Sequence, residues 1–192
     1  MAPYAPLHLI VGMHRSGTSL LGSLLPACGI TLPGPLIPGD THNPEGYFER
    51  SDITALQEQV LIALERWWPA PRGMHRLPQG WLDSPVGQRA LEELIALLGA
   101  EHQEQRLPWA IKDPRSSLLL PLWRAACERL GIPLKLLLAV RDPAEVMVSL
   151  VQRDRDATGM DGWRAQRLWW HHNSQVLREG QHLALQVVSY SH

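Results

Sequence analysis

A short loop bounded by two glycines is the first part of the sequence with residues suited to chemistry. Gly12 and Gly17 are separated by four residues, which is the spacing of nucleotide-binding P-loops. Glycines let backbone N–H groups turn toward an anion, and a helix that begins after the loop adds partial positive charge. Thr18 stands where a P-loop normally has lysine, and Arg15 lies inside the loop. The loop therefore predicts a phosphate cradle, and the missing lysine favours a donor other than ATP.

A second anion site is predicted around residues 141–149. Arg141 follows an apolar run and precedes Asp142 and Pro143, and Ser149 comes two helical turns later. An arginine fork forms bidentate, charge-assisted bonds with a phosphate, and a hydroxyl adds another donor. The alternative is an arginine and an aspartate that serve only the helix terminus, with Ser149 in no special role.

A lysine at the end of an expected strand is a candidate for stabilising charge during group transfer. The chain has 16 arginines and only two lysines, Lys112 and Lys135, so Lys112 is less readily explained as generic surface charge. A compact ammonium group can approach a transferred oxyanion closely, and such stabilisation is commonly the largest catalytic term. The alternative is an ordinary surface ion pair between Lys112 and Asp113.

Group transfer to a hydroxyl also needs a residue that accepts a proton. The sequence offers five candidates near the first loop, and only geometry can decide among them. For the histidine beside the loop we favour a packing or hydrogen-bonding role, and the last of the carboxylates could equally cap the helix that follows it. The five are His14, Asp40, His42, Glu45 and Glu49.

Strands that alternate with helices predict an α/β fold, with a parallel sheet covered by helices on both faces. Ligands of such sheets bind at the carboxyl ends of the strands, where the three charged loops lie. Short apolar runs predict strands over 7–11, 108–111, 134–140 and 183–190. Apolar residues at helical spacing predict helices over 18–28, 51–66, 86–105, 115–130, 144–153 and 163–179.

Composition excludes several classes of protein. The chain has 192 residues, 45% of them hydrophobic and 19% charged, which fits one domain with a real core. A net charge of −1 disfavours a protein that wraps nucleic acid. No apolar run approaches the ~18 residues that span a bilayer. Cys28 and Cys127 form no CxxC pair, so we expect a reducing, cytoplasmic compartment.

The segment before the last strand carries residues that need a simpler explanation. His171 and His172 are adjacent on an expected helix and therefore point about 100° apart, so we expect no metal site there. Trp169, Trp170 and Asn173 lie on the same helix, and core packing is the expected role of its aromatic residues.

The three charged motifs together resemble the sulfotransferases that use 3′-phosphoadenylyl sulfate (PAPS). The first loop looks like the arginine form of that family's 5′-phosphosulfate loop, as in tyrosylprotein and many bacterial sulfotransferases. Arg141 and Ser149 match the motif for the 3′-phosphate, and Lys112 matches a lysine that contacts the transferred sulfate. The matching loop residues are Arg15, Ser16, Gly17, Thr18 and Ser19.

The resemblance implies a three-layer P-loop nucleotide-kinase-like sheet and in-line sulfuryl transfer, with PAP as the product and no metal. Glu45 precedes Phe48 by three residues, as in the Glu-x-x-Phe element that carries the base in several carbohydrate sulfotransferases. We therefore expect Glu45 to act as the base, with Glu49 as the alternative, and Lys112 with Arg15 to stabilise the sulfuryl group. The acceptor would be a hydroxyl or amine of a small molecule, carbohydrate or peptide.

The end of the chain departs from the family pattern. In the family, a tyrosine and an acidic pair follow the last strand, and a further segment helps to close over the adenine. Here Ser191 and His192 follow Tyr190. The resemblance thus implies one domain over residues 1–192 without the family's C-terminal segment, and Tyr190 beside the adenine.

Two other functions remain open from the sequence. One is a P-loop phosphotransferase that uses ATP, which the missing loop lysine disfavours. The other is a non-catalytic module that binds PAP or another nucleotide.

Overall fold

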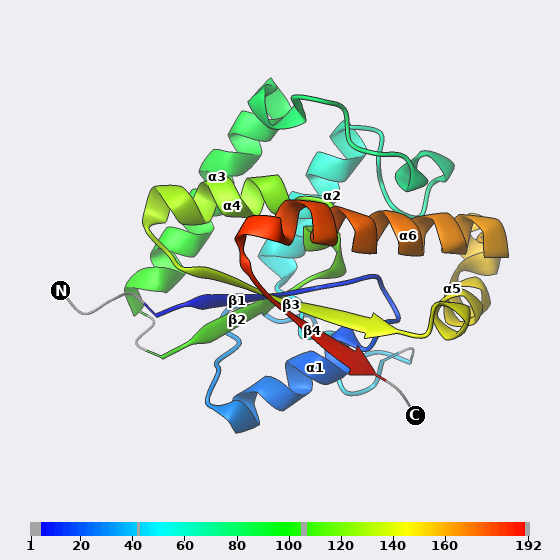
Figure 1. Ribbon diagram of the computed structural model, residues 1–192, viewed down its shortest axis with the longest axis horizontal. Helices are drawn as coiled ribbons and strands as arrows, with labels where there is room; N and C mark the ends of the chain where they lie inside the picture. The colour runs from blue at the N-terminus through cyan, green and yellow to red at the C-terminus, as the bar shows by residue number, and fades with distance from the viewer. Residues whose placement is uncertain (1–4, 42, 105–106, 191–192) are drawn as a thin grey trace.

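A four-stranded parallel sheet forms the centre of the computed structural model, which describes residues 5–41, 43–104 and 107–190 (Figure 1). Every pair of neighbouring strands is parallel, so the carboxyl ends of all four lie at the same end of the sheet. The strands, in spatial order, are β2 (Trp109–Lys112), β1 (Leu7–Val11), β3 (Leu134–Arg141) and β4 (Ala184–Tyr190).

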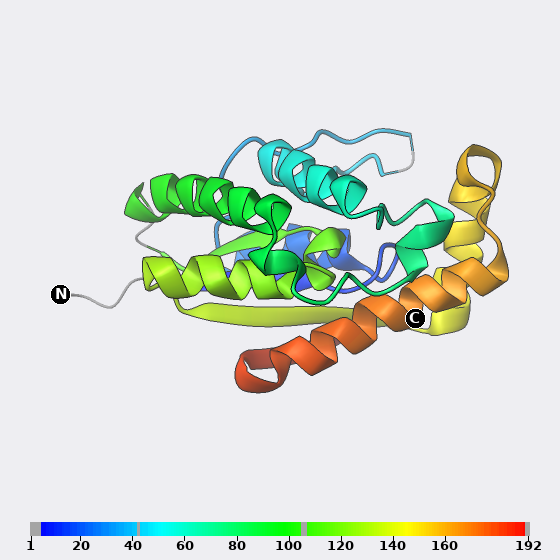
Figure 2. The same ribbon diagram turned by 90° about the horizontal axis from the view of Figure 1, so that it is seen from above.

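Helices cover both faces of this sheet, which confirms the predicted α/β architecture (Figures 1 and 2). Helix α1 lies on one face, where Leu25 packs with Ile10 and Leu137. The larger apolar cluster lies on the other face, beneath helices α2, α3, α4 and α6. The helices are α1 (Thr18–Leu24), α2 (Ser51–Ala63), α3 (Pro85–Glu104), α4 (Leu120–Leu130), α5 (Pro143–Thr158) and α6 (Gly162–Glu179).

Buried tryptophans and one buried amide hold the larger cluster together. Trp109 of β2 and Trp123 of α4 are completely buried. The indole N–H of Trp123 donates to the side-chain oxygen of Gln57, 3.1 Å away, and the hydroxyl of Ser116 donates to the same oxygen at 2.9 Å. These bonds satisfy polar groups that would otherwise be costly to bury, and they connect α2 with α4.

The helix predicted over 115–130 is wrong for its first five residues, 115–119. Residues Pro114–Ser117 form a 3₁₀ turn, and α4 begins only at Leu120. The side chain of Asp113 caps the turn by accepting a hydrogen bond from the backbone N–H of Arg115 at 2.8 Å. Pro121 prevents a continuous helix, because its ring would clash with the backbone one turn earlier. The interruption leaves the turn directly beside the carboxyl end of β2.

Three other helices end at residues that differ from the prediction, and α2 is one of them because it ends at Ala63 and not at 66. Helix α1 ends at Leu24 and passes into a 3₁₀ turn that contains Pro26. Helix α5 continues to Thr158, beyond the predicted end at 153, and stops where Gly159 takes a left-handed conformation with φ of 66°. None of the helices in the described residues is long and apolar enough to cross a membrane.

Adjacent residues on α2 provide a matched test of this packing. Leu61 is completely buried in the larger cluster, whereas Ile62 is 58% exposed. We expect Leu61→Ala to lower the free energy of unfolding by about 2–5 kcal/mol because it leaves a cavity. Ile62→Ala should change it by about 0.5 kcal/mol or less. Urea denaturation followed by circular dichroism measures both, and equal losses for the two variants would contradict the packing described for α2.

Candidate functional site

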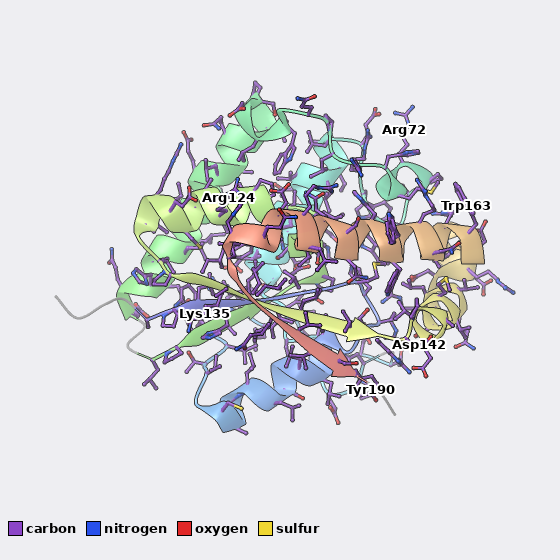
Figure 3. All side chains as sticks on the ribbon, viewed as in Figure 1. Arg72, Arg124, Lys135, Asp142, Trp163 and Tyr190 are labelled. Atoms are coloured by element: carbon purple, nitrogen blue, oxygen red, sulfur yellow. The ribbon has the colours of Figure 1, made fainter. Side chains whose placement is uncertain are left out.

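The loops that follow β1, β2 and β3 meet around one cavity of about 600 Å³. Tyr190 at the end of β4 and Asp142 at the start of α5 lie at this end of the sheet, whereas Lys135 lies at the opposite end (Figure 3). The lining carries more positive than negative side chains, which suits an anionic ligand. The charged residues that line the cavity are Arg15, Glu49, Lys112, Arg115, Arg141, Arg153 and Asp154.

Both glycines of the first loop are required by close contacts. Gly12 has a φ of 131°, and a Cβ there would lie 2.4 Å from the carbonyl oxygen of Ala139. The backbone N–H of Gly12 donates to the hydroxyl of Ser117 at 2.8 Å, which ties the loop to the turn after β2. Gly17 has a φ of 83°, and a Cβ there would lie 3.3 Å from the Cβ of Tyr190. The loop therefore packs tightly between β3 and the end of β4.

The two predicted phosphate motifs meet in one hydrogen bond. Arg15 Nε donates to Ser149 Oγ at 2.8 Å, across 134 positions of sequence. Arg15 adopts a left-handed backbone with φ of 69°, which is uncommon for a residue other than glycine. Arg141 ion-pairs with Glu145, with 2.5 Å between Nε and Oε2, and its guanidinium lies 5.2 Å from the ring centre of Tyr190. The arginines of both motifs thus border the same cavity.

The remaining predicted loop residues divide into two groups. Thr18 and Ser19 line the cavity. Ser16 is completely buried, and its hydroxyl has no hydrogen-bond partner among the described residues. The hydroxyl of Ser19 accepts a hydrogen bond from Lys112 Nζ at 3.3 Å. Lys112 of β2 therefore brings an ammonium group beside the loop, although the loop itself has no lysine.

Lys112 forms an ion pair with Glu49, which was the alternative to Glu45 as the predicted base. Lys112 is 2% exposed and Glu49 is 5% exposed. Lys112 Nζ lies 2.5 Å from Glu49 Oε1, and an Arg115 side-chain nitrogen lies 3.1 Å from Glu49 Oε2. Both oxygens of Glu49 thus face cations in the cavity lining.

Arg115 belongs to a denser set of charges. It also pairs with Asp113 at 3.0 Å and with Glu58 at 2.8 Å. Burial acts to lower the pKa of Arg115, but the charges of Asp113, Glu49 and Glu58 outweigh it and raise that pKa overall. Its charge is therefore compensated by its neighbours, unlike that of Arg15, whose pKa is lowered by burial and by the nearby Arg153.

The predicted base lies outside the cavity lining. Glu45 is exposed on its loop and is not among the described residues that border the cavity, whereas Glu49 borders it. Asp40 accepts a hydrogen bond from the Tyr47 hydroxyl at 2.8 Å and does not line the cavity either. His42 lies outside the described residues, as do the Ser191 and His192 that follow Tyr190. The choice of Glu45 stays a prediction, and the geometry favours Glu49.

The sequence left the role of Trp68 open between stacking on an acceptor and anchoring a long loop, and it gave no role to Arg153; both line the cavity. Trp68 stacks on His14 with 4.2 Å between ring centres, and the Arg153 guanidinium lies 5.3 Å from the Trp68 ring centre. Arg153 follows Ser149 by four residues on α5, so helical spacing could have indicated it. Trp68 lies in an irregular segment with several prolines, where no periodic pattern indicates which side chains turn inward.

Three histidines form a buried group that extends inward from the cavity lining at His14. The ring centres of His14 and His172 are 6.2 Å apart, and those of His171 and His172 are 6.3 Å apart. Burial, with Arg115 and other cations nearby, lowers the pKa of His14 well below its usual value. Burial lowers the pKa of His171 to about 4 and that of His172 to about 3. The described residues contain no group of three or more side chains suited to a metal ion.

Two solved structures with the same fold are sulfotransferase domains. The sulfotransferase domain from the Synechococcus PCC 7002 olefin synthase matches 99% of this chain and 68% of its own, at 20% identity and a TM-score of 0.53. The sulfotransferase domain from the curacin biosynthetic pathway matches 98% of this chain and 68% of its own, at 17% identity and a TM-score of 0.53. No protein-family model and no curated protein sequence matches the chain. The likeness confirms the predicted fold.

The buried histidines predict a loss of stability in mild acid. His172 has a folded pKa of about 3, below its unfolded value of about 6.5, so the unfolded state binds its proton first. The contribution of His172 to the free energy of unfolding is therefore fully present above about pH 6.5. It falls as the pH drops toward 3, by about 1.4 kcal/mol per pH unit. His172→Phe should flatten the slope of unfolding free energy against pH by nearly one proton between about pH 6 and 5. Urea denaturation at several pH values measures it, and an unchanged slope would mean that His172 is not buried in its neutral form.

Proposed function

We propose that the protein transfers a sulfuryl group from PAPS to a hydroxyl or amine of an acceptor molecule. The observation that carries the proposal is the hydrogen bond between Arg15 and Ser149, because it joins the two phosphate motifs in one site. One motif would hold the 5′-phosphosulfate and the other the 3′-phosphate. The fold shared with two sulfotransferase domains supports the proposal.

The first loop fits the phosphosulfate end of such a donor. Its glycines bring the backbone into positions that a side chain at either would obstruct, and the buried hydroxyl of Ser16 has no described partner. The 3′-phosphate would lie between Arg141 and Ser149, with Tyr190 beside the adenine. The residues proposed to hold the donor are Arg15, Ser16, Gly17, Thr18, Ser19, Arg141, Ser149 and Tyr190.

Lys112 and Arg15 would stabilise the charge that develops in transfer. The bound donor supplies a sulfuryl group attached to a phosphate that is a good leaving group. Lys112 already points at Ser19 of the loop, so its ammonium is directed toward the region where the sulfuryl oxygens would lie. Cations fixed in advance around a developing charge need little rearrangement, which is the main source of electrostatic catalysis.

Glu49 is better placed than Glu45 to take the proton from the acceptor. It borders the cavity and faces Lys112, whereas Glu45 is exposed outside the lining. In the proposed step a bond forms between the acceptor oxygen and sulfur, and the bond from sulfur to the leaving phosphate oxygen breaks. The acceptor's proton passes to Glu49 Oε1 as Lys112 turns from Glu49 to the sulfuryl oxygens.

A phosphotransferase that uses ATP is the second candidate, because Lys112 brings an ammonium group to within 3.3 Å of Ser19 in a loop that has no lysine of its own. Such enzymes hold Mg²⁺ with a carboxylate after a neighbouring strand. Asp113 follows β2, but its Oδ1 accepts from Arg115 and its Oδ2 accepts from Thr54 at 2.9 Å. The engagement of both oxygens favours the sulfotransferase.

The choice of nucleotide separates these functions. PAP should raise the unfolding temperature without metal, by a stabilisation of about 2.7 kcal/mol at a hundredfold excess over its dissociation constant. Arg141→Ala should weaken PAP binding about 10- to 100-fold through loss of a charge-assisted contact. Arg72→Ala is the matched control, because the side chain of Arg72 is 68% exposed and lies outside the cavity lining. Thermal shift and calorimetry measure these effects.

Two results would overturn the proposed function. One is stabilisation by ATP with Mg²⁺ that equals or exceeds stabilisation by PAP. The other is a loss of PAP affinity in Arg72→Ala as large as in Arg141→Ala.

Substitution of the two glutamates identifies the base. Glu49→Gln should lower PAP formation from PAPS about 100-fold or more, because an amide cannot accept the proton. Glu45→Gln, exposed on the neighbouring loop, should retain the rate. PAP release is measured with a panel of hydroxyl and amine acceptors, and PAP binding is measured for each variant. If Glu45→Gln is the slow variant and Glu49→Gln is not, the assignment from sequence is right and the one from geometry is wrong.

A further inference from the structure

One cation in the cavity lining has no role in the donor site proposed above. Arg153 lies on α5, and its side chain is 18% exposed. Asp154 binds one edge of its guanidinium, because Nε donates to Oδ1 and Nη2 donates to Oδ2, both at 2.8 Å. The second edge, which includes Nη1, donates no hydrogen bond to any residue that the structure describes. An edge of this shape fits a carboxylate or a phosphate.

The ion pair of Arg153 with Asp154 still presents positive charge to the cavity. Burial lowers the pKa of Arg15 most, and the charge of Arg153 lowers it next. Asp154 acts to raise the same pKa, but by less than Arg153 lowers it. The guanidinium is therefore the stronger of the two charges at the first loop, and an anion between the two arginines would relieve their repulsion.

An aromatic ring holds Arg153 in place. The guanidinium lies 5.3 Å from the ring centre of Trp68, a distance at which a cation and an aromatic ring attract each other. Trp68 is 7% exposed and stacks on His14, so the ring is itself confined. A side chain that is held in advance loses less freedom when a ligand binds. We call Trp68, Arg153 and Asp154 the anion subsite.

A buried arginine fixes the two sides of the anion subsite relative to each other. Arg164 is 8% exposed. Its Nη1 donates to the carbonyl oxygen of Gly159 at 2.9 Å, just after α5, and its Nη2 donates to the carbonyl oxygen of Pro69. Figure 2 shows the segment between α2 and α3 passing beside α5 and α6. Arg164 thus ties the residue after Trp68 to the end of the helix that completes the subsite.

The anion subsite lies on the side of the cavity where the proposed base lies. Arg153 is one helical turn, about 6 Å, further along α5 than Ser149, and so further from the start of the helix, where the 3′-phosphate is proposed. Burial, and then the hydrogen bond and charge of Asp40, raise the pKa of Tyr47. The charges of Arg153 and Glu49 act on that pKa in opposite directions, so both lie near Tyr47 in the lining.

We infer that the acceptor carries a carboxylate or another anionic oxygen group, which binds the second edge of Arg153. The inference rests on the proposed function, because it places the acceptor between the anion subsite and Glu49. Two parallel hydrogen bonds from the guanidinium would hold the anionic group while the reacting hydroxyl or amine meets Glu49. Asp154 is then a positioning residue, since it orients the guanidinium.

Matched pairs of acceptors test the subsite on the full chain. Calorimetry with PAP present, which fills the donor site, measures binding of hydroxyphenylacetate against its amide and of glycerol phosphate against glycerol. The charged member of at least one pair should bind the wild type about 10-fold or more tightly, as a charge-assisted contact predicts. Release of PAP from PAPS should show the same preference in kcat/KM.

Substitutions in the ion pair distinguish recognition from a merely structural role. Arg153→Gln combined with Asp154→Asn removes both charges together, and should abolish the preference while PAP affinity is retained. Asp154→Asn alone still accepts from Nε but removes the competing charge, so the preference should increase. Arg155→Gln is the matched control, because Arg155 is exposed on α5 outside the cavity lining. Circular dichroism verifies that all variants fold.

Three results would overturn the inference alone. One is a wild type that binds PAP but binds the neutral member of each pair as tightly as the charged one. Another is a preference that persists in the double variant. A third is a loss of PAP affinity in the double variant as large as in Arg141→Ala, which would assign Arg153 to the donor. Absence of PAP binding by the wild type would instead overturn the proposed function and the inference with it.

Discussion

Two buried cations impose the main constraint on this structure. Lys112 and Arg115 lie at the end of β2 with little exposure to water, and an unpaired charge in such a position costs several kcal/mol, of the order measured when a buried ion pair is broken. Glu49 faces both cations, and Asp113 and Glu58 complete the pairing of Arg115. Because Glu49 belongs to the long segment between α1 and α2, neutralising the cations also holds that segment against the sheet.

Under the proposed function, the same pairing would prepare the site for an anionic ligand. An anion bound in the first loop would compete with Glu49 for Lys112, whereas Arg115 would keep its other two carboxylate partners. Ligand binding can therefore redirect Lys112 without leaving Arg115 uncompensated. Ser19, 3.3 Å from Lys112 Nζ, would keep the ammonium hydrogen-bonded during that movement, and Arg115 would keep Glu49 paired. In the proposed reaction, the arrangement would link binding of the anion to release of the Glu49 carboxylate from Lys112.

Sequence patterns predicted the sheet and the tight glycine loop after β1 because these depend on local signals. An apolar run that ends at Gly12 predicts both a strand and a tight turn, and the structure has both. The identity of the acid in the cavity depends instead on the path of an irregular segment. Glu45 and Glu49 are four residues apart there, and the partner that draws Glu49 inward, Lys112, comes from a strand 63 positions later. No local pattern contains that contact, nor the one that turns Trp68 toward His14.

Helix α6 shows a further limit of periodicity. Apolar residues occur on two sides of it, and a sequence does not tell which side meets the core. In the structure His172 points inward. There it packs near His14, which in turn stacks on Trp68 in the cavity lining. Trp170, two residues earlier, consequently points outward. The rotation of the helix thus decides both results: the inner side supports the candidate site, and the outer side leaves Trp163, Trp170 and Leu177 exposed, so the packing role expected for Trp170 is wrong. A substitution of one of these exposed residues should leave the inner contacts intact, because the two sides share only the helix backbone.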